Sequence, residues 1–340
     1  MIDSGDTLTW PNEITVTNDL HVNIDEHGVK HINQYFKIGE IGKGSTSKVK
    51  LYQGQSSKVA FKIFNKSSLV RKRHKYSNTK GGMRITTAWH QVQNEIDILL
   101  SLKRHKSICP LLEILDSEDS NKLYLVFLFL AGGPLMNLDS KSREFYNGIT
   151  GTVLDIPMTV KYGFQIADAL AFLHQRQIIH RDIKPSNILL SHDGQNAFLS
   201  DLGVSLKVSL EGDVAGTEGT HVFFSPEICH GGTYNGYAAD MWAFGVTLYI
   251  CMFGRLPFYN EVPTELFELI QNCEPNFRIK PETFAPHSKM ELLLTNANVS
   301  GISQFLNSFL AKDASARITA EKAPTVMERL LQSYNQTFAD

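Results

Sequence analysis

The chain has 340 residues, 42% of them apolar, and a formal net charge of -2 at pH 7. This length predicts one or two domains with a sizeable core, and the charge gives no global signal for nucleic acid or an acidic membrane surface. The cysteines lie far apart without a Cys-x-x-Cys pair, which indicates reduced thiols of an intracellular protein rather than a disulfide framework or a zinc site. They are Cys109, Cys229, Cys251 and Cys273.

No segment has the pattern of a signal peptide or a membrane span. Residues 1–6 are polar and acidic, unlike the start of a secreted precursor. The most apolar stretch, residues 241–254, is too short to cross a bilayer and is bounded by Asp240 and Arg255. It therefore predicts a buried core helix.

The first 130 residues are rich in predicted strands. Residues 1–32 are polar and predict an extended or poorly ordered leader. Helical spacing over residues 89–103 places Val92, Ile96, Leu99 and Leu100 on one face. Strands are predicted at 38–51, as two strands joined by a glycine-containing turn, and at 59–64, 111–115 and 123–129.

The pattern becomes helical after Gly132-Gly133-Pro134. Helices are predicted at 160–175, 239–252, 264–272 and 301–311. The chain is therefore expected to be an α+β protein with a β-rich small lobe, a helical large lobe and a cleft between them. The predicted boundaries are 1–32 for the leader, 33–130 for the small lobe with a basic insert at 66–84, 131–326 for the large lobe and 327–340 for a short tail.

A glycine-rich segment, Gly42-Lys43-Gly44-Ser45-Thr46-Ser47-Lys48-Val49, lies between two predicted strands. Its glycines let the backbone approach phosphates and direct N–H groups at them. The next strand carries Val59-Ala60-Phe61-Lys62, which makes Lys62 a candidate phosphate ligand, with a solvated surface lysine as the alternative. Glu95 is the best carboxylate partner for Lys62, because Asp97 lies roughly 200° away around the predicted helix.

Two further motifs supply charged groups. They are His180-Arg181-Asp182-Ile183-Lys184-Pro185-Ser186-Asn187 and Asp201-Leu202-Gly203. They place a carboxylate, a lysine and a metal-binding asparagine within one loop and a second carboxylate a hairpin later. Phosphoryl transfer from ATP needs such a set, because its catalysis is mostly positioning and charge neutralisation.

These motifs resemble those of eukaryotic Ser/Thr protein kinases, and the resemblance covers about residues 35–326. It implies a bilobal protein kinase fold that uses ATP and Mg²⁺ to phosphorylate a protein substrate. The implied catalytic residues are Asp182 as base or orienter of the substrate hydroxyl, Lys184 for the transferred phosphoryl group, Lys62 for the α- and β-phosphates and Glu95 as its partner. Asn187 and Asp201 are the implied Mg²⁺ ligands.

The resemblance also implies an adenine site. Phe127 would be the gatekeeper, and the backbone of Leu128 and Leu130 would hydrogen-bond the base. Two positions depart from the family pattern, Ser47 in place of the third glycine and Leu202 in place of phenylalanine. The implied ATP-binding residues are Ile41, Gly42, Lys43, Gly44, Val49, Ala60, Lys62, Phe127, Leu128, Leu130 and Leu189.

Several residues are expected to support this site. Thr220 fits a position from which it hydrogen-bonds Asp182 and Lys184. The family pattern pairs Glu227 with Arg317 and makes Asp240 the cap of the catalytic loop, which are structural roles. Arg181 precedes the catalytic aspartate, so a phosphate on the activation loop is its expected partner, with Thr217 as the candidate phosphosite.

Shorter segments narrow the resemblance to the calcium/calmodulin-dependent protein kinase kinases and their fungal relatives. These segments are Asn33-Gln34-Tyr35, the long basic gap between Lys62 and Glu95, Gly132-Gly133-Pro134-Leu135-Met136, and residues 245–258. Members of that group phosphorylate the activation loops of AMP-activated and related kinases. A downstream kinase is therefore the expected protein substrate, while nucleic acid and membrane are not expected partners.

Three alternatives stay open at this point. The chain is either such a kinase kinase, a Ser/Thr kinase of the wider calmodulin-kinase or AMP-activated type, or a pseudokinase scaffold. The basic insert is either a solvated loop, a docking element or a nuclear-localisation signal. A cytoplasmic location is expected, with a nuclear one depending on that insert. Residues 320–340 hold only Lys322 and Arg329 as cations, so calmodulin binding is not supported by this chain.

Overall fold

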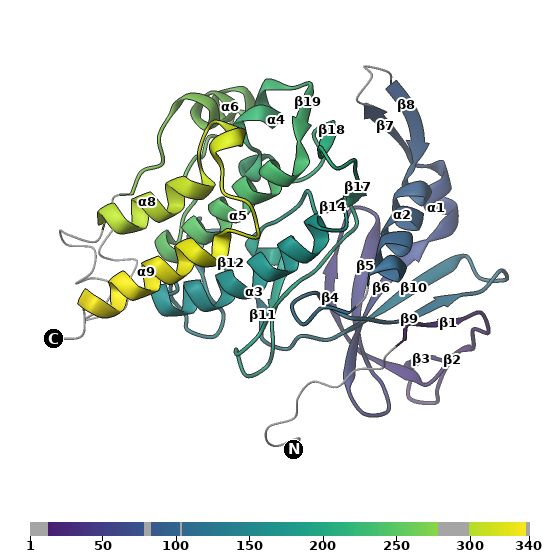
Figure 1. Ribbon diagram of the computed structural model, residues 1–340. Helices are drawn as coiled ribbons and strands as arrows, with labels where there is room; N and C mark the ends of the chain where they lie inside the picture. Colours follow the sequence, from purple (N-terminus) through teal and green to yellow (C-terminus); the bar gives the residue numbers. More distant parts are fainter. Residues whose placement is uncertain (1–12, 78–82, 103, 278–298, 338–340) are drawn as a thin grey trace. The chain divides into compact units, whose positions relative to one another are not determined.

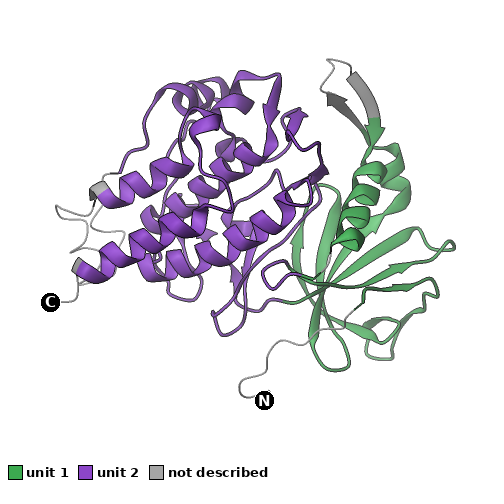
Figure 2. Cartoon of the chain, in the orientation of Figure 1, with its two compact units in different colours: residues 1–75, 85–104, 109–129 green, residues 76–84, 105–108, 130–340 purple. Residues whose placement is uncertain are grey.

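The computed structural model describes residues 13–77, 83–102, 104–277 and 299–337 (Figure 1). The chain divides into two compact units, each described by itself (Figure 2). Unit 1 comprises residues 1–75, 85–104 and 109–129, and unit 2 comprises 76–84, 105–108 and 130–340. The α+β class and the kinase-type division into a β-rich and a helical part are confirmed.

Unit 1 is built on one sheet with the strand order β1-β9-β10-β6-β5-β4-β3-β2. Neighbouring strands are antiparallel except for β1 and β9, which are parallel. The strands are β1 (Thr15–Thr17), β2 (Val22–Ile24), β3 (Lys30–Ile32), β4 (Tyr35–Lys43), β5 (Ser47–Gln53), β6 (Lys58–Asn65), β9 (Leu111–Asp116) and β10 (Lys122–Leu128).

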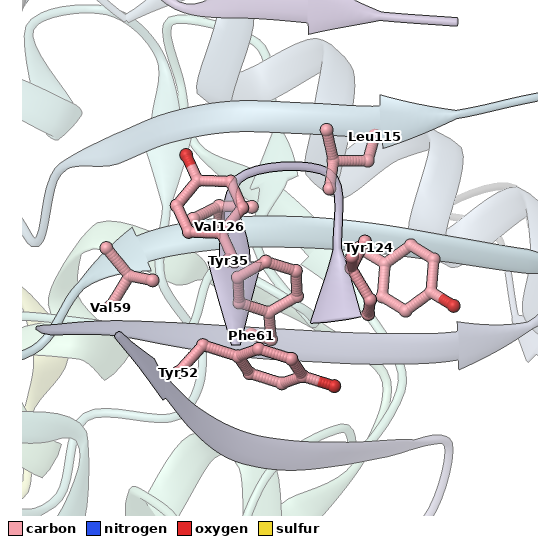
Figure 3. Packing of buried hydrophobic residues seen from close by; sticks show 8 residues of the cluster. Tyr35, Tyr52, Val59, Phe61, Leu115, Tyr124 and Val126 are labelled. Atoms are coloured by element: carbon pink, nitrogen blue, oxygen red, sulfur yellow. The ribbon is translucent and has the colours of Figure 1, made fainter. Parts of the chain in front are cut away.

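Aromatic rings fill the core of unit 1 on one face of this sheet (Figure 3). The ring of Phe61 lies 4.2 Å from that of Tyr52 and 5.1 Å from that of Tyr35, measured between centroids. Such tilted and edge-on pairs stabilise a core beyond the area that they bury. The cluster consists of Ile32, Tyr35, Tyr52, Val59, Phe61, Leu115, Tyr124 and Val126.

Of the two predicted states of the leader, extended or poorly ordered, residues 15–32 take the extended one, because they form β1, β2 and β3 at the two edges of this sheet. The buried carboxylate of Glu113 on β9 explains how a polar strand is held there. It accepts hydrogen bonds from the hydroxyl groups of Thr17 and Tyr35, the latter at 2.7 Å. Burial and the neighbouring Glu113 raise the pKa of Tyr35 above its ordinary range.

Helix α2 (Ala88–Ser101) matches the predicted helix, and its predicted face is buried in part. Val92 and Leu99 are buried as predicted, whereas Leu100 is 47% exposed. Glu95 and Ile98 are buried as well, so the buried stripe is shifted from the predicted one.

The basic insert is structured over its described residues. It forms α1 (Lys66–Arg71), β7 (Arg73–Ser77) and β8 (Met83–Thr87). Leu69 of α1 is buried, and α1 packs on α2.

Helices α3 (Ile156–His174) and α5 (Gly236–Phe253) pack together in unit 2, and α9 (Ala323–Thr337) runs along α3 (Figure 1). The side chain of Asp155 begins α3 by accepting the Met158 N–H at 2.8 Å. Met327 and Leu330 are buried on α9, so the expected tail at 327–340 starts inside a packed helix. The remaining helices are α4 (Pro226–His230), α6 (Pro263–Asn272) and α8 (Val299–Phe309).

The apolar stretch 241–254 lies almost wholly within α5, which is buried along most of its length. In the described part of the chain, no helix has both the length and the apolar character needed to cross a membrane.

Short strands and turns connect the helices of unit 2. Two of them, β15 and β16, form a hairpin between the two charged motifs. The strands are β11 (Gly133–Pro134), β12 (Asn137–Leu138), β13 (Phe145–Tyr146), β14 (Ile178–Ile179), β15 (Ile188–Leu190), β16 (Ala197–Leu199), β17 (Leu206–Lys207), β18 (Asp213–Ala215) and β19 (Thr233–Asn235). The 3-10 turns are η1 (Pro185–Asn187), η2 (His221–Phe223) and η4 (Ala314–Ala316).

Candidate active site

The glycine-rich segment forms the turn between β4 and β5 in unit 1. The Gly44 N–H donates to the Ser47 carbonyl at 2.9 Å, which closes the turn. The pairing of β4 with β5 shifts register between Glu40 and Gly42, so the strand bends before the turn. Ile41, Gly42, Lys43 and Gly44 are exposed, as a loop that covers a ligand requires.

Lys62 and Glu95 meet in unit 1 as the sequence predicts. The Lys62 Nζ lies 2.5 Å from the Glu95 Oε1, with side chains 14% and 2% exposed. β6 supplies the lysine and α2 the carboxylate, and Asp97 is exposed on another face of α2. The ion pair therefore fixes the Lys62 ammonium beside the strand that carries Val49, the register partner of Lys62 on β5.

The predicted adenine-binding residues follow the same strands. Ala60 on β6 pairs with Phe127 on β10. The Leu128 N–H donates to the Pro110 carbonyl at 3.1 Å, and its carbonyl accepts from the Cys109 thiol at 3.9 Å. The Leu130 carbonyl accepts from the Gly133 N–H at 3.2 Å.

The catalytic candidates of unit 2 form one hydrogen-bonded cluster. The Lys184 Nζ lies 2.7 Å from Asp182 Oδ2, and Thr220 Oγ1 donates to Asp182 Oδ1 at 2.9 Å. The Thr220 hydroxyl also accepts from Lys184 Nζ at 3.0 Å. Asn187 Nδ2 donates to both the backbone carbonyl and the carboxylate of Asp182, at 2.7 and 2.9 Å. The structure thus brings together the three predicted residues of the catalytic loop and the supporting residue Thr220.

Asp240 at the start of α5 holds the backbone of this loop. Its buried carboxylate accepts the N–H groups of His180 and Arg181 at 2.8 and 2.9 Å. His174 makes a third contact at 3.0 Å, and no sequence signal indicated its role. These bonds hold Arg181 at a φ of 68°, a left-handed conformation that costs a non-glycine residue about 1–3 kcal/mol.

Gly219 is required by the same backbone. Its φ is 114°, and a Cβ there would lie 2.5 Å from the Arg181 carbonyl oxygen. The loop that carries Thr220 can therefore approach the catalytic loop only with glycine at this position.

Asn187 and Asp201 have the chemistry of Mg²⁺ ligands. The Asn187 amide directs its Nδ2 at Asp182, which leaves Oδ1 as an oxygen donor. Ser200, the neighbour of Asp201, donates its N–H to the Asn187 carbonyl at 2.8 Å, and this bond links the two ligand segments. No group of three or more His, Cys, Asp or Glu residues in the described part of the chain is suited to a metal ion. Mg²⁺ usually takes one or two carboxylates together with substrate phosphates, so this small donor set fits it.

The Arg181 side chain lines a surface pocket together with Glu218 and Tyr234. Among the described residues, nothing hydrogen-bonds its buried Nε and Nη2 atoms. Burial raises the pKa of Tyr234, while the nearby Arg181 acts in the opposite direction. Thr217 is exposed, one residue after Gly216, at which a Cβ would lie 3.8 Å from Arg181 Nη2.

Glu227 and Arg317 form the structural pair predicted from the sequence. The two nitrogens Nη1 and Nη2 contact the two carboxylate oxygens at 2.7 and 3.0 Å, and the Arg317 side chain is fully buried. Loss of one partner of such a pair costs about 3–5 kcal/mol.

The protein kinase domain model matches residues 35–327, so the chain belongs to the protein kinase family. Its predicted place among Ser/Thr protein kinases of the calcium/calmodulin-dependent protein kinase kinase group is confirmed by its relatives. A protein kinase domain implies ATP and a protein substrate.

Three of these relatives come from a plant, an animal and a fungus. Serine/threonine-protein kinase GRIK2 of Arabidopsis thaliana is 33% identical over 268 residues, which are 75% of this chain and 60% of that protein. The calcium/calmodulin-dependent protein kinase kinase of Caenorhabditis elegans is 34% identical over 71% of this chain and 45% of that protein. SNF1-activating kinase 1 of Saccharomyces cerevisiae is 32% identical over 77% of this chain and 25% of that protein. The chain thus spans between a quarter and three fifths of these relatives.

Proposed function

We propose that this chain is an active Ser/Thr protein kinase that transfers the γ-phosphoryl group of ATP to the activation loop of a downstream kinase. The observation that carries the chemistry is the cluster around Asp182, in which a lysine, an asparagine and a threonine fix both carboxylate oxygens. The substrate class rests on similarity to relatives such as SNF1-activating kinase 1, whose name describes the activation of another kinase.

Asp182 orients the substrate hydroxyl and accepts its proton as the phosphoryl group leaves ATP. Lys184, 2.7 Å from that carboxylate, neutralises charge on the transferred group. Lys62, fixed by Glu95, holds the α- and β-phosphates. Mg²⁺ bound through Asn187 and Asp201 would supply further neutralisation of the phosphates.

Thr217 is the proposed phosphosite of the activation loop. Two buried nitrogens of Arg181, Nε and Nη2, have no hydrogen-bond partner among the described residues. This supports an anionic partner beside the Arg181 guanidinium. A phosphate on Thr217 would provide charge-assisted acceptors for that guanidinium. Phosphatase treatment should then lower activity, and a Thr217→Ala variant should show no further loss on treatment. Full activity of the Thr217→Ala variant would show that phosphorylation of Thr217 does not regulate the activity.

The test of the proposed function is transfer of labelled phosphate from MgATP to the inactive catalytic domain of an AMP-activated-type kinase. The expected result is incorporation at the activation-loop threonine, absent when that substrate threonine is changed to alanine. Incorporation into a generic Ser/Thr peptide alone would support the proposed phosphoryl transfer but contradict the proposed substrate. The chain would then be assigned to the wider group of Ser/Thr kinases. ATP binding without transfer to either substrate would contradict the proposal and favour a scaffold.

A further inference from the structure

One lysine of the basic insert reaches the tip of the glycine-rich turn. The Lys72 Nζ donates a hydrogen bond to the Ser45 carbonyl at 3.4 Å. Ser45 lies within the turn that is closed by the hydrogen bond from the Gly44 N–H to the Ser47 carbonyl. Lys72 follows α1, and the proposed function assigns it no role. Both segments belong to unit 1, so the contact is internal to that unit.

The backbone of Lys72 is held from two sides. Its N–H caps α1 by donating to the Ser68 carbonyl at 3.1 Å, and its carbonyl accepts the N–H of Ala88, the first residue of α2, at 2.9 Å. The start of α1 is fixed as well, because Asn65 accepts the Ser68 N–H at 2.9 Å. The corner that carries Lys72 is therefore well defined, while its side chain stays exposed and extends to the loop.

The contact between Lys72 and Ser45 is a hydrogen bond and not an ion pair, because the acceptor is a neutral carbonyl. Lys66 in the same insert differs, since its Nζ lies 2.5 Å from Asp116. Residues 66–84 contain seven lysines and arginines and no acidic residue. An anion that approaches the glycine-rich turn thus meets the Lys72 ammonium group, and the insert contains no carboxylate that could pair with this group instead.

We propose that Lys72 is a positioning residue for the nucleotide. It holds the tip of the glycine-rich turn from the outside and adds positive charge at the rim of the phosphate site. Because its carbonyl is bonded to the first residue of α2, the same corner connects the turn to the helix that carries Glu95. This inference rests on the proposed function for its effect on ATP, but the contact itself is independent of it.

The experiment compares Lys72→Met and Lys72→Arg with the matched control Arg71→Met. Arg71 is the exposed neighbour with the same charge at the end of α1. Lys72→Met should raise the Kd for MgATP and the KM for ATP about two- to fivefold, the range for one exposed charged contact, with kcat within about twofold. Lys72→Arg and Arg71→Met should stay near the parent values, because the first keeps a cationic donor and the second leaves Lys72 in place.

Hydrogen exchange of the amides of residues 43–47 in the nucleotide-free protein provides the second readout. Lys72→Met should speed their exchange, whereas Arg71→Met should not. Equal effects of Lys72→Met and Arg71→Met on both readouts would overturn the inference, because only general charge would then matter. If the parent protein neither binds ATP nor transfers phosphate, the proposed function fails, and faster exchange in Lys72→Met alone would still establish the contact.

Discussion

The two units hold their functional groups in different ways. In unit 1, the Lys62 ammonium is paired with the carboxylate of Glu95, which comes from helix α2. A strand and a helix must both be in place for this pair to form. The position of Lys62 is therefore sensitive to any change that moves α2.

In unit 2, Asp182 is held by several contacts at once. Both of its carboxylate oxygens have partners, and Asp240 holds the preceding backbone through two N–H groups. Overlapping contacts of this kind maintain a strained backbone that no single bond would hold. The comparison indicates a catalytic loop held by overlapping contacts and a nucleotide lysine whose pairing with Glu95 depends on the position of α2.

The largest effect is expected at the centre of the unit 2 cluster. Asp182→Asn keeps the shape of the side chain but removes the base, so phosphoryl transfer should fall about 10²- to 10⁴-fold. Single-turnover kinetics measure the loss, and thermal unfolding and ATP binding are the controls that should change little. Activity above about a tenth of the parent value would mean that Asp182 does not act on the substrate hydroxyl.

The catalytic loop was predictable from sequence because its chemistry requires particular residue types at fixed spacing. Its conformation was not, since Arg181 and Asp201 adopt positive φ values of 68° and 61° without being glycine. For Arg181, the cause is the distant carboxylate of Asp240. The family resemblance identifies Asp240 as the cap of the loop but not the backbone conformation that it holds.

Edge strands of unit 1 were less predictable. The contact that holds β1 joins Thr17 to Glu113, which are 96 residues apart. Local composition describes Thr17 as polar and solvent-facing, because the buried acceptor lies far away in sequence. The predicted face of α2 was right only in part for a related reason, since hydrophobic spacing alone does not count Glu95 among the buried residues.

The second prediction tests the ion pair between Lys62 and Glu95. Lys62→Met removes the ammonium from a carboxylate that is only 2% exposed, so unfolding should become about 3–5 kcal/mol easier and ATP binding weaker. Urea unfolding measures the loss of stability, with Lys58→Met at the exposed start of β6 as the control.

Adding Glu95→Gln to Lys62→Met separates stability from function. The double variant removes the buried charge, so it should recover stability without recovering ATP binding. Equal stability of the single and double variants would show that the ion pair contributes little to the position of α2.

The third prediction measures how redundant the unit 2 cluster is. Thr220→Val removes one hydrogen bond to Asp182 and one from Lys184 but leaves the other contacts. Activity should fall about tenfold, near the value of one hydrogen bond to a charged group. Thr220→Ser keeps the hydroxyl and should retain most activity, and a loss as large as that of Asp182→Asn would show that the cluster has no redundancy.

The smallest effect is expected far from the site, at the edge of unit 1. Thr17→Val removes one donor to the buried Glu113, so stability should fall by about 1 kcal/mol while kcat and KM stay unchanged. Urea unfolding measures the change in stability, with Thr15→Val, at an exposed residue of the same strand, as the control. Because Tyr35 also donates to Glu113, the carboxylate keeps a partner and the loss should stay small. A larger fall in Thr15→Val than in Thr17→Val would show that strand pairing with β9, rather than the buried carboxylate, holds β1 in the sheet.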